Sequence, residues 1–249
     1  MWNDLQSPIV IAHRGDKAYA PENTLSAFKQ AAEKGADAIE FDVKLTADGQ
    51  VIVLHDQTVD RTTNGTGNVA KLPCATIRDL DAGVQFSQEF LGERIPTLEE
   101  VFETFGKRIY MNVELKNYST PNDMLVSKVA QIVKNHGMQE KVLFSSFLAY
   151  NLRKARLLLP EVPRGLLILP GLIGFWGRTF GWRGNYAALH PPMRNVDAEL
   201  LNRIHAAGKR LITWTVTAEA DIRRMIGLGV DGIITDDTAL ALRLLGRSK

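Results

Sequence analysis

The sequence is poor in cysteine, with Cys74 as the single thiol among 249 residues. One thiol excludes an intramolecular disulfide and leaves too few sulfur ligands for a structural zinc site, so the composition fits a reducing compartment. The amino end, MWNDLQSPIVIAHRG, lacks the basic start and apolar core of an export signal. We therefore expect a cytoplasmic protein.

An excess of charge of one sign is also missing, because 30 Lys and Arg face 28 Asp and Glu, for a formal net charge of +2. This balance does not indicate nucleic acid or an anionic membrane as the main partner, and any positive charge that matters must be local. Long apolar runs are absent too. The uncharged stretch Gly165 to Gly177 has 13 residues and is interrupted at Pro170, whereas a membrane-spanning helix needs about 20. We expect no transmembrane segment, and transient membrane contact stays open.

What the sequence does contain is an alternation of apolar strand-like runs with amphipathic helical stretches. A hairpin accounts for one of the nine strand candidates, and the other eight can run parallel, which predicts an α/β fold: a single TIM (β/α)8 barrel spanning residues 1–249. A Gly-, Thr- and Asn-rich connection, followed by a weakly patterned region to about Gly92, is interpreted as a small insertion after the second barrel strand and its hairpin. An open doubly wound sheet is the alternative. The strand candidates are Ile9–Ala12, the two arms of the hairpin, which begin at Ala38 and at Val51, and Ile109–Lys116, Val142–Phe147, Arg164–Leu169, Ala187–His190, Arg210–Val216 and Gly232–Asp236.

The hairpin is AIEFDVKLTADGQVIVLHD, from Ala38 to Asp56. Glu40 and Asp42 lie two residues apart, so both carboxylates leave the same face of the first strand. The Asp-Gly turn is too short for a parallel crossover, and the two runs should pair antiparallel, with His55 roughly opposite Asp42.

In a parallel barrel, the side chains at strand ends meet at one mouth. Glu40, Asp42 and Glu114 would then share a cavity, and three uncompensated carboxylates there call for a cation. Ligation by oxygen alone favours one divalent cation, Mg²⁺ or Ca²⁺, without deciding between them. The three acids are the predicted metal ligands.

Basic side chains at the same strand ends complete a candidate catalytic set. His13 and His55 are the predicted catalytic pair, one accepting a proton and the other donating it. Arg14 and Lys116 supply positive charge for phosphate oxygens. Together with the acids, these groups describe metal-assisted phosphodiester cleavage.

Two further strand-end residues, His190 and Trp214, are candidates for substrate binding. Each has a structural alternative, since His190 precedes two prolines and fits a loop-capping role, and Trp214 fits core packing. The apolar region 166–182 is most simply a strand with a packed loop, and its alternative is a wall for a bulky substrate.

The sequence contains a succession of short motifs: His13-Arg14-Gly15, Pro21-Glu22-Asn23-Thr24, Glu40-Phe41-Asp42-Val43, Leu45-Thr46-Ala47-Asp48-Gly49, His55-Asp56, Arg61-Thr62-Thr63, Ile95-Pro96-Thr97-Leu98, Asn112-Val113-Glu114-Leu115-Lys116, Trp214-Thr215-Val216 and Gly232-Ile233-Ile234-Thr235-Asp236. Their order resembles the glycerophosphodiester phosphodiesterase family, a bacterial type within a superfamily that also includes inositol phospholipases C. As that resemblance implies, the fold is a β/α barrel that uses a divalent cation to hydrolyse glycerophosphodiesters to sn-glycerol 3-phosphate and an alcohol. Its metal carboxylates match Glu40, Asp42 and Glu114, and its acid and base match His13 and His55. One departure is Thr217, where the family commonly has asparagine. The family's characteristic insertion matches the region of about 57–108.

The expected partner is therefore a small glycerophosphodiester, and nucleic acid is not expected. The main alternative is a lysophospholipase D that seats an acyl chain in region 166–182. Two others are a cyclic-phosphate-forming phospholipase C and a barrel that binds a phosphorylated ligand without turnover. The sequence leaves open the head group, the nucleophile (water or a substrate hydroxyl) and the oligomeric state.

Overall fold

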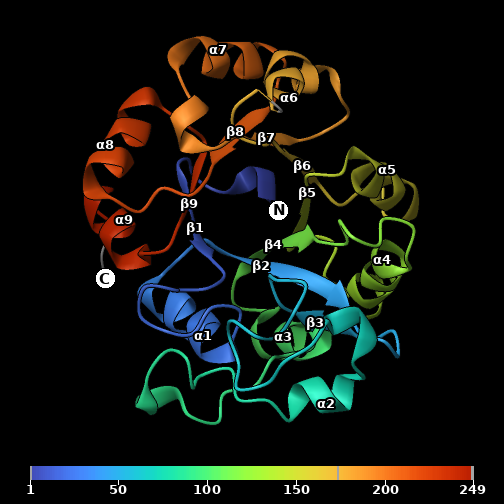
Figure 1. The fold of residues 1–249 in the computed structure, drawn as a ribbon. Coiled ribbons are helices and arrows are strands. Elements are labelled where there is room, and N and C mark those ends of the chain that lie inside the picture. Colours follow the sequence, from blue (N-terminus) through green and yellow to red (C-terminus); the bar gives the residue numbers. More distant parts are fainter. Residues whose placement is uncertain (1, 173, 248–249) are drawn as a thin grey trace.

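A computed structural model describes residues 2–172 and 174–247, which form a barrel of eight parallel strands ringed by helices (Figure 1). The sheet runs in the order β1-β9-β8-β7-β6-β5-β4-β2, and parallel pairing of β1 with β2 closes it. Closure confirms the predicted barrel and rules out the open doubly wound sheet. The strands are β1 (Ile9–His13), β2 (Ala38–Leu45), β4 (Tyr110–Leu115), β5 (Val142–Ser146), β6 (Arg164–Leu167), β7 (Ala188–His190), β8 (Arg210–Thr213) and β9 (Gly232–Thr235).

Four of the described helices begin at a side chain that caps their free N–H groups. Thr24 caps α1, Asp197 caps α7 and Asp237 caps α9, each by accepting a backbone N–H. Thr97 and Glu100 form a reciprocal capping box at the start of α3. The helices are α1 (Leu25–Lys34), α2 (Cys74–Arg78), α3 (Leu98–Phe105), α4 (Leu125–Asn135), α5 (Ala149–Leu158), α6 (Phe175–Phe180), α7 (Ala198–Ala206), α8 (Glu219–Leu228) and α9 (Thr238–Leu244).

The hairpin forms as expected, with β3 (Val51–Val53) antiparallel to β2, but its register differs by one residue from the prediction. Val43 pairs with Val53, and the Leu54 N–H donates to the Asp42 carbonyl oxygen. Leu54 is therefore opposite Asp42, and His55 follows it in the loop beyond the strand. The expected neighbourhood of His55 and the acids nevertheless forms, because the loop turns His55 toward the barrel mouth.

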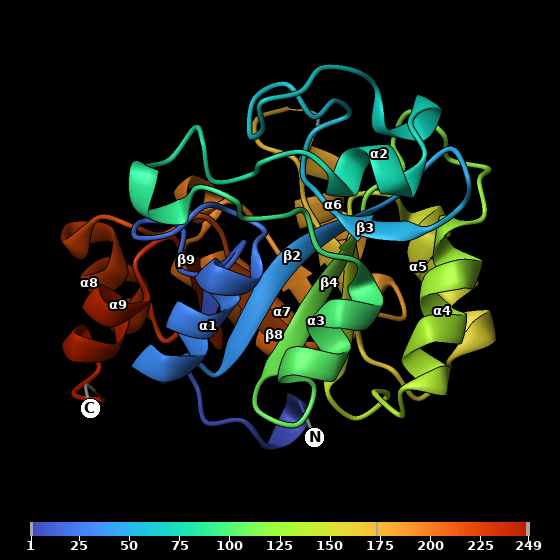
Figure 2. The same cartoon turned by 90° about the horizontal axis from the view of Figure 1, so that it is seen from below.

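A long excursion links β3 to α3 and lies over the end of the barrel at which the strands finish (Figure 2). It contains α2 and two short 3-10 helices, η2 (Val69–Lys71) and η3 (Gln88–Phe90). A small apolar cluster that includes Val59 and Ile77 packs it against β3. The predicted insertion of about 57–108 also takes in α3, which here packs between α1 and α4 as a helix of the outer ring. The division into one domain with an insertion stays a prediction.

The two-residue period of the strands sorts the barrel interior into layers. Inward-facing apolar side chains such as Ile9, Ala38 and Leu143 fill the amino end, which Trp2 covers. Two or four residues further along the same strands, the inward positions are His13, Glu40 and Ser145. The polar side chains thus collect at the carboxyl ends of the strands.

Among the described residues, no helix has both the length and the apolar character needed to cross a bilayer. The link between β6 and β7, interpreted from the sequence as a packed loop, contains α6 and the 3-10 helix η4 (Gly181–Arg183).

Candidate active site

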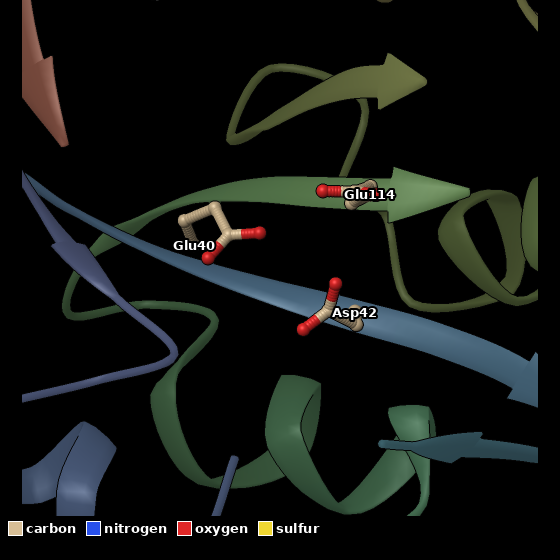
Figure 3. Close-up of side chains that lie close together, drawn as sticks. All are labelled: Glu40, Asp42 and Glu114. Carbon is tan, nitrogen blue, oxygen red and sulfur yellow. The ribbon is translucent and has the colours of Figure 1, made fainter. Parts of the chain in front are cut away.

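The centre of the site is a cluster of three carboxylates. Glu40 and Asp42 come from β2 and Glu114 from β4, and Asp42 is in register with Glu114. One ligand oxygen from each residue lies within 4.8 Å of the others, and the residues are 4%, 1% and 8% exposed. Figure 3 shows the three carboxylate groups turned toward a common space between the two strands. The strand period and the β2–β4 pairing together produce this convergence.

Two cations compensate part of this negative charge. Lys116 Nζ lies 3.2 Å from Asp42 Oδ1 and 3.6 Å from Glu114 Oε1, and Arg14 Nε lies 3.5 Å from Asp42 Oδ2. Burial opposes ionisation of Asp42, but Lys116 and Arg14 hold the pKa of its carboxyl well below its usual range. Burial, followed by the charge of Asp42, raises the pKa values of Glu40 and Glu114.

This arrangement fits a divalent cation. Burial and repulsion disfavour charge on two of the three acids, and a doubly positive ion among them would relieve both effects. The donors are all carboxylate oxygens, which are the ligands that Mg²⁺ and Ca²⁺ prefer. The donor set is therefore that of a hard-cation site.

Each predicted catalytic histidine is held by its own carboxylate. His13 Nδ1 lies 2.6 Å from Asp236 Oδ1, and His55 Nδ1 lies 2.6 Å from Asp56 Oδ1. A proton on Nδ1 donates to the carboxylate and leaves Nε2 of each ring available to a ligand. Burial lowers the pKa of both imidazoles, although the neighbouring carboxylates act in the opposite sense.

The loop after β1 holds the acids through backbone and side-chain contacts. Arg14 and Asn23 both have left-handed backbone conformations, with φ of 57° and 60°. The Asn23 amide donates to Asp42 Oδ2 at 3.1 Å, and the Arg14 backbone N–H donates to Glu40 Oε2 at 3.1 Å. Non-glycine residues adopt this conformation at a cost of about 1–3 kcal/mol, and such outliers concentrate at functional sites. This strained loop therefore belongs to the site.

A pocket of about 410 Å³ opens between these groups at the carboxyl end of the barrel. The predicted site residues line this pocket, with two exceptions. Asp42 contacts Arg14 and Lys116, which line the pocket, and His190 lies elsewhere. Trp214 forms part of the wall, with its ring 5.6 Å from that of Phe147 and its Nε1 donating to the His190 carbonyl oxygen. The lining residues are His13, Arg14, Glu40, His55, Asn112, Glu114, Lys116, Ser145, Phe147, Leu167, Trp214 and Ile234.

His190 is placed elsewhere, inside the barrel. It is fully buried, does not line the pocket, and neither ring nitrogen has a hydrogen-bond partner among the described residues. Its ring lies against the backbone of Gly165 on the neighbouring strand. Burial lowers the pKa of His190 to about 3, so the ring is neutral at ordinary pH.

Several residues of the site were not assigned from the sequence. Asn112 and Ser145 line the pocket, are buried, and have side-chain polar atoms without a partner in the described part of the chain. Asn112 lies two residues before Glu114, so the strand period alone identifies its face. Tyr118, whose hydroxyl donates to Glu114 Oε1 at 2.6 Å, lies in a loop where no periodicity identifies it.

Comparison with known proteins gives the family of this chain. A family model described as "Glycerophosphoryl diester phosphodiesterase family" matches residues 13–240. The chain belongs to this family. As a member it is an enzyme, a hydrolase of phosphoric diesters, in agreement with the resemblance noted in the motifs.

Similar proteins extend over nearly the whole chain. A glycerophosphodiester phosphodiesterase of Caldanaerobacter subterraneus is 44% identical over 238 residues, covering 95% of this chain and 97% of that protein. One of Bacillus altitudinis is 35% identical over 94% of this chain and 97% of its own length.

Solved structures agree in fold. A phosphodiesterase of Oleispira antarctica, in complex with the product sn-glycerol-3-phosphate, superimposes with a TM-score of 0.89 at 32% identity, covering 96% of this chain and 97% of that one. A glycerophosphodiester phosphodiesterase of Agrobacterium tumefaciens gives 0.79 at 30% identity, covering 95% and 99%.

Proposed function

We propose that this enzyme hydrolyses glycerophosphodiesters to sn-glycerol 3-phosphate and an alcohol. The observation that carries the proposal is the cluster of Glu40, Asp42 and Glu114 in a pocket shared with two histidines, in a chain of this family. The Oleispira structure with sn-glycerol-3-phosphate supports the product.

The histidines would move the protons. Nε2 of one ring accepts a proton as the new phosphorus–oxygen bond forms, either from water or from a substrate hydroxyl whose cyclic phosphate product water then opens. Nε2 of the other donates a proton to the alcohol oxygen as the old bond breaks. Asp236 and Asp56 orient the rings and stabilise the imidazolium form. Arg14 and Lys116 neutralise the phosphate oxygens, Arg14 through its planar fork and Lys116 as a point charge.

Glu40, Asp42 and Glu114 would hold one divalent cation, Mg²⁺ or Ca²⁺. When bound, such an ion polarises phosphoryl oxygens and lowers the pKa of a coordinated hydroxyl. Asn23 and Tyr118 would position two of the ligands, through their contacts with Asp42 and Glu114. Trp214 and Phe147 would form the apolar side of the substrate pocket. Because of its burial, His190 is assigned no direct contact with substrate.

The lysophospholipase D alternative is not favoured. Of the region 166–182, Leu167 alone lines the pocket, and the remaining lining is mostly charged and polar. This suits a deacylated diester better than one with an acyl chain. A comparison of rates on deacylated and monoacylated substrates tests the choice.

The test is a turnover panel with glycerophosphocholine, glycerophosphoethanolamine and lysophospholipids, followed by enzymatic measurement of glycerol 3-phosphate. Chelator should abolish release, and Mg²⁺ or Ca²⁺ should restore it. His13→Ala and His55→Ala should each lower kcat by about 100-fold or more. Phosphorus NMR of early products separates attack by water from attack by a substrate hydroxyl, since the latter gives a cyclic phosphate.

His205→Ala is the matched control, because His205 also pairs with an aspartate, Asp231, through Nε2 at 2.8 Å but lies on the outer helix α7. Its turnover should equal that of the unmodified enzyme. Full activity in His13→Ala, or in the presence of chelator, would refute the assigned roles.

A further inference from the structure

Helix α6 packs in an unusual way, with glycines against the barrel and large apolar side chains in solvent. A Cβ on Gly177 would meet Ile168, and one on Gly181 would meet Leu189 and Leu166, so these positions face the strands. Trp176 is 69% exposed, and Leu172, just before the helix, is 91% exposed. Small residues on the inner face allow close packing, and the apolar bulk of the segment is left on the outside.

Three of the exposed side chains contact one another, and together with two exposed leucines nearby in the chain we call them the apolar rim. Trp176 stacks on Phe180 at a ring distance of 5.3 Å and meets Phe175 edge-on at 6.0 Å. Clustered apolar side chains exposed on the surface of a domain indicate an interaction site. The apolar rim consists of Leu169, Leu172, Phe175, Trp176 and Phe180.

The segment of the chain that contains the rim carries charge of one sign. No aspartate or glutamate occurs between Glu161 and Asp197. Arg183 is exposed and lies over the Phe180 ring, 5.3 Å from its centroid, and Arg194 is exposed nearby in the chain. Aromatic and aliphatic side chains bordered by arginine are the composition of protein segments that lie in the headgroup region of a bilayer.

The rim also borders the active-site mouth. Pro170, between Leu169 and Leu172, lines a surface depression together with Trp214, and Trp214 is also a wall of the active-site pocket. Figure 1 shows α6 in the part of the ring next to β6 and β7. In Figure 2 it lies toward the end of the barrel that the excursion covers, away from the N-terminus.

We propose that the apolar rim is a docking surface for an anionic phospholipid bilayer. A second copy of the chain fits less well, because a two-fold dimer through this face would bring Arg183 and Arg194 toward their own equivalents without an acidic partner. A bilayer containing anionic lipid can bind both the aromatic side chains and the arginines. The rings would enter the headgroup region, and the arginines would bind lipid phosphates. Docking would hold the active-site mouth at a lipid surface.

Sedimentation of the protein with vesicles tests this proposal. We expect binding to vesicles of equal parts phosphatidylcholine and phosphatidylglycerol, and weaker binding to phosphatidylcholine alone. Trp176→Ser and Leu172→Ser should each weaken binding about tenfold. Arg183→Gln should weaken binding to the anionic vesicles about fivefold, and salt should do the same.

Leu157→Ser is the matched control, because Leu157 is 78% exposed but lies near the end of α5, at the opposite end of the barrel. It should bind like the unmodified protein. Turnover of a water-soluble diester should be equal in all the variants, so loss of docking is distinguishable from loss of the proposed activity. The proposal is overturned if the unmodified protein does not sediment with anionic vesicles, if Leu157→Ser loses as much binding as Trp176→Ser, or if ultracentrifugation shows a dimer that Trp176→Ser dissociates.

Discussion

The buried ring of His190 should make the folded state sensitive to mild acid. Burial lowers the pKa of His190 from its ordinary 6.5 to about 3. Between these two pH values the unfolded chain binds a proton that the folded chain does not. Because the folded pKa is the lower one, the contribution of this residue to stability is complete above about pH 6.5 and is lost progressively as pH falls toward about 3.

The magnitude follows from the two pKa values. At about pH 5 the unfolded imidazole is almost fully protonated and the folded one almost fully neutral, so the free energy of unfolding falls by about 2 kcal/mol relative to about pH 7.5. Other groups titrate over the same range, including the carboxyls of Glu40 and Glu114, whose pKa values are raised. Their effect is shared by a variant that lacks only the imidazole, and it cancels in the comparison.

Urea unfolding of the unmodified protein and of His190→Leu, at about pH 7.5 and about pH 5, measures the effect. The unmodified protein should lose about 2 kcal/mol more than the variant between the two conditions. Equal losses in both proteins would refute the reasoning. So would an NMR titration that gave His190 an ordinary pKa in the folded protein.

Three other substitutions test the packing and the site. Gly165→Ala should lower the free energy of unfolding by about 2 kcal/mol, because the added methyl group meets the His190 ring, and thermal unfolding should show a lower Tm. Thr97→Ala removes the capping box of α3 and should cost about 1 kcal/mol in urea unfolding without changing KM. Asp236→Asn should lower kcat by about tenfold or more with little change in unfolding free energy, because His13 loses the carboxylate that orients it; an unchanged kcat would exclude that role.

The barrel could be predicted from the sequence because its evidence is local and repeated. Apolar runs that alternate with helices bounded by capping residues such as Thr24, Thr97 and Asp197 define the elements, and their number defines the closure. The hairpin register was wrong by one residue, because turn length alone does not fix which residues pair. Helix α6 was missed because its 6 residues, with Gly177 among them, are too few to show a helical period.

The site could be predicted where its residues lie on strands. Glu40, Asp42 and Glu114 follow from a two-residue period and from adjacent parallel strands. Asn23 and Tyr118 could not be assigned in this way, because their positions depend on the path of a loop. His190 ends β7, as it ends the predicted strand, and its side chain lies on the inward face. Whether such a side chain reaches the mouth or turns inward depends on the neighbouring strand, where Gly165 leaves room for its ring.

The same layering that makes the site predictable also explains how the barrel tolerates it. The carboxyl end of the barrel contains features that destabilise a fold: clustered buried acids, two left-handed non-glycine residues and unpartnered polar atoms of Asn112 and Ser145. The amino end contains closely packed apolar side chains, including Ile9 and Leu143, on the same strands. Because both layers belong to one closed sheet, the strands that carry strained polar groups at one end are anchored by apolar packing at the other. Substitutions in the apolar layer should therefore lower activity mainly through stability. Replacing Glu40 or Glu114, whose pKa values are raised, by glutamine should lower activity and raise stability.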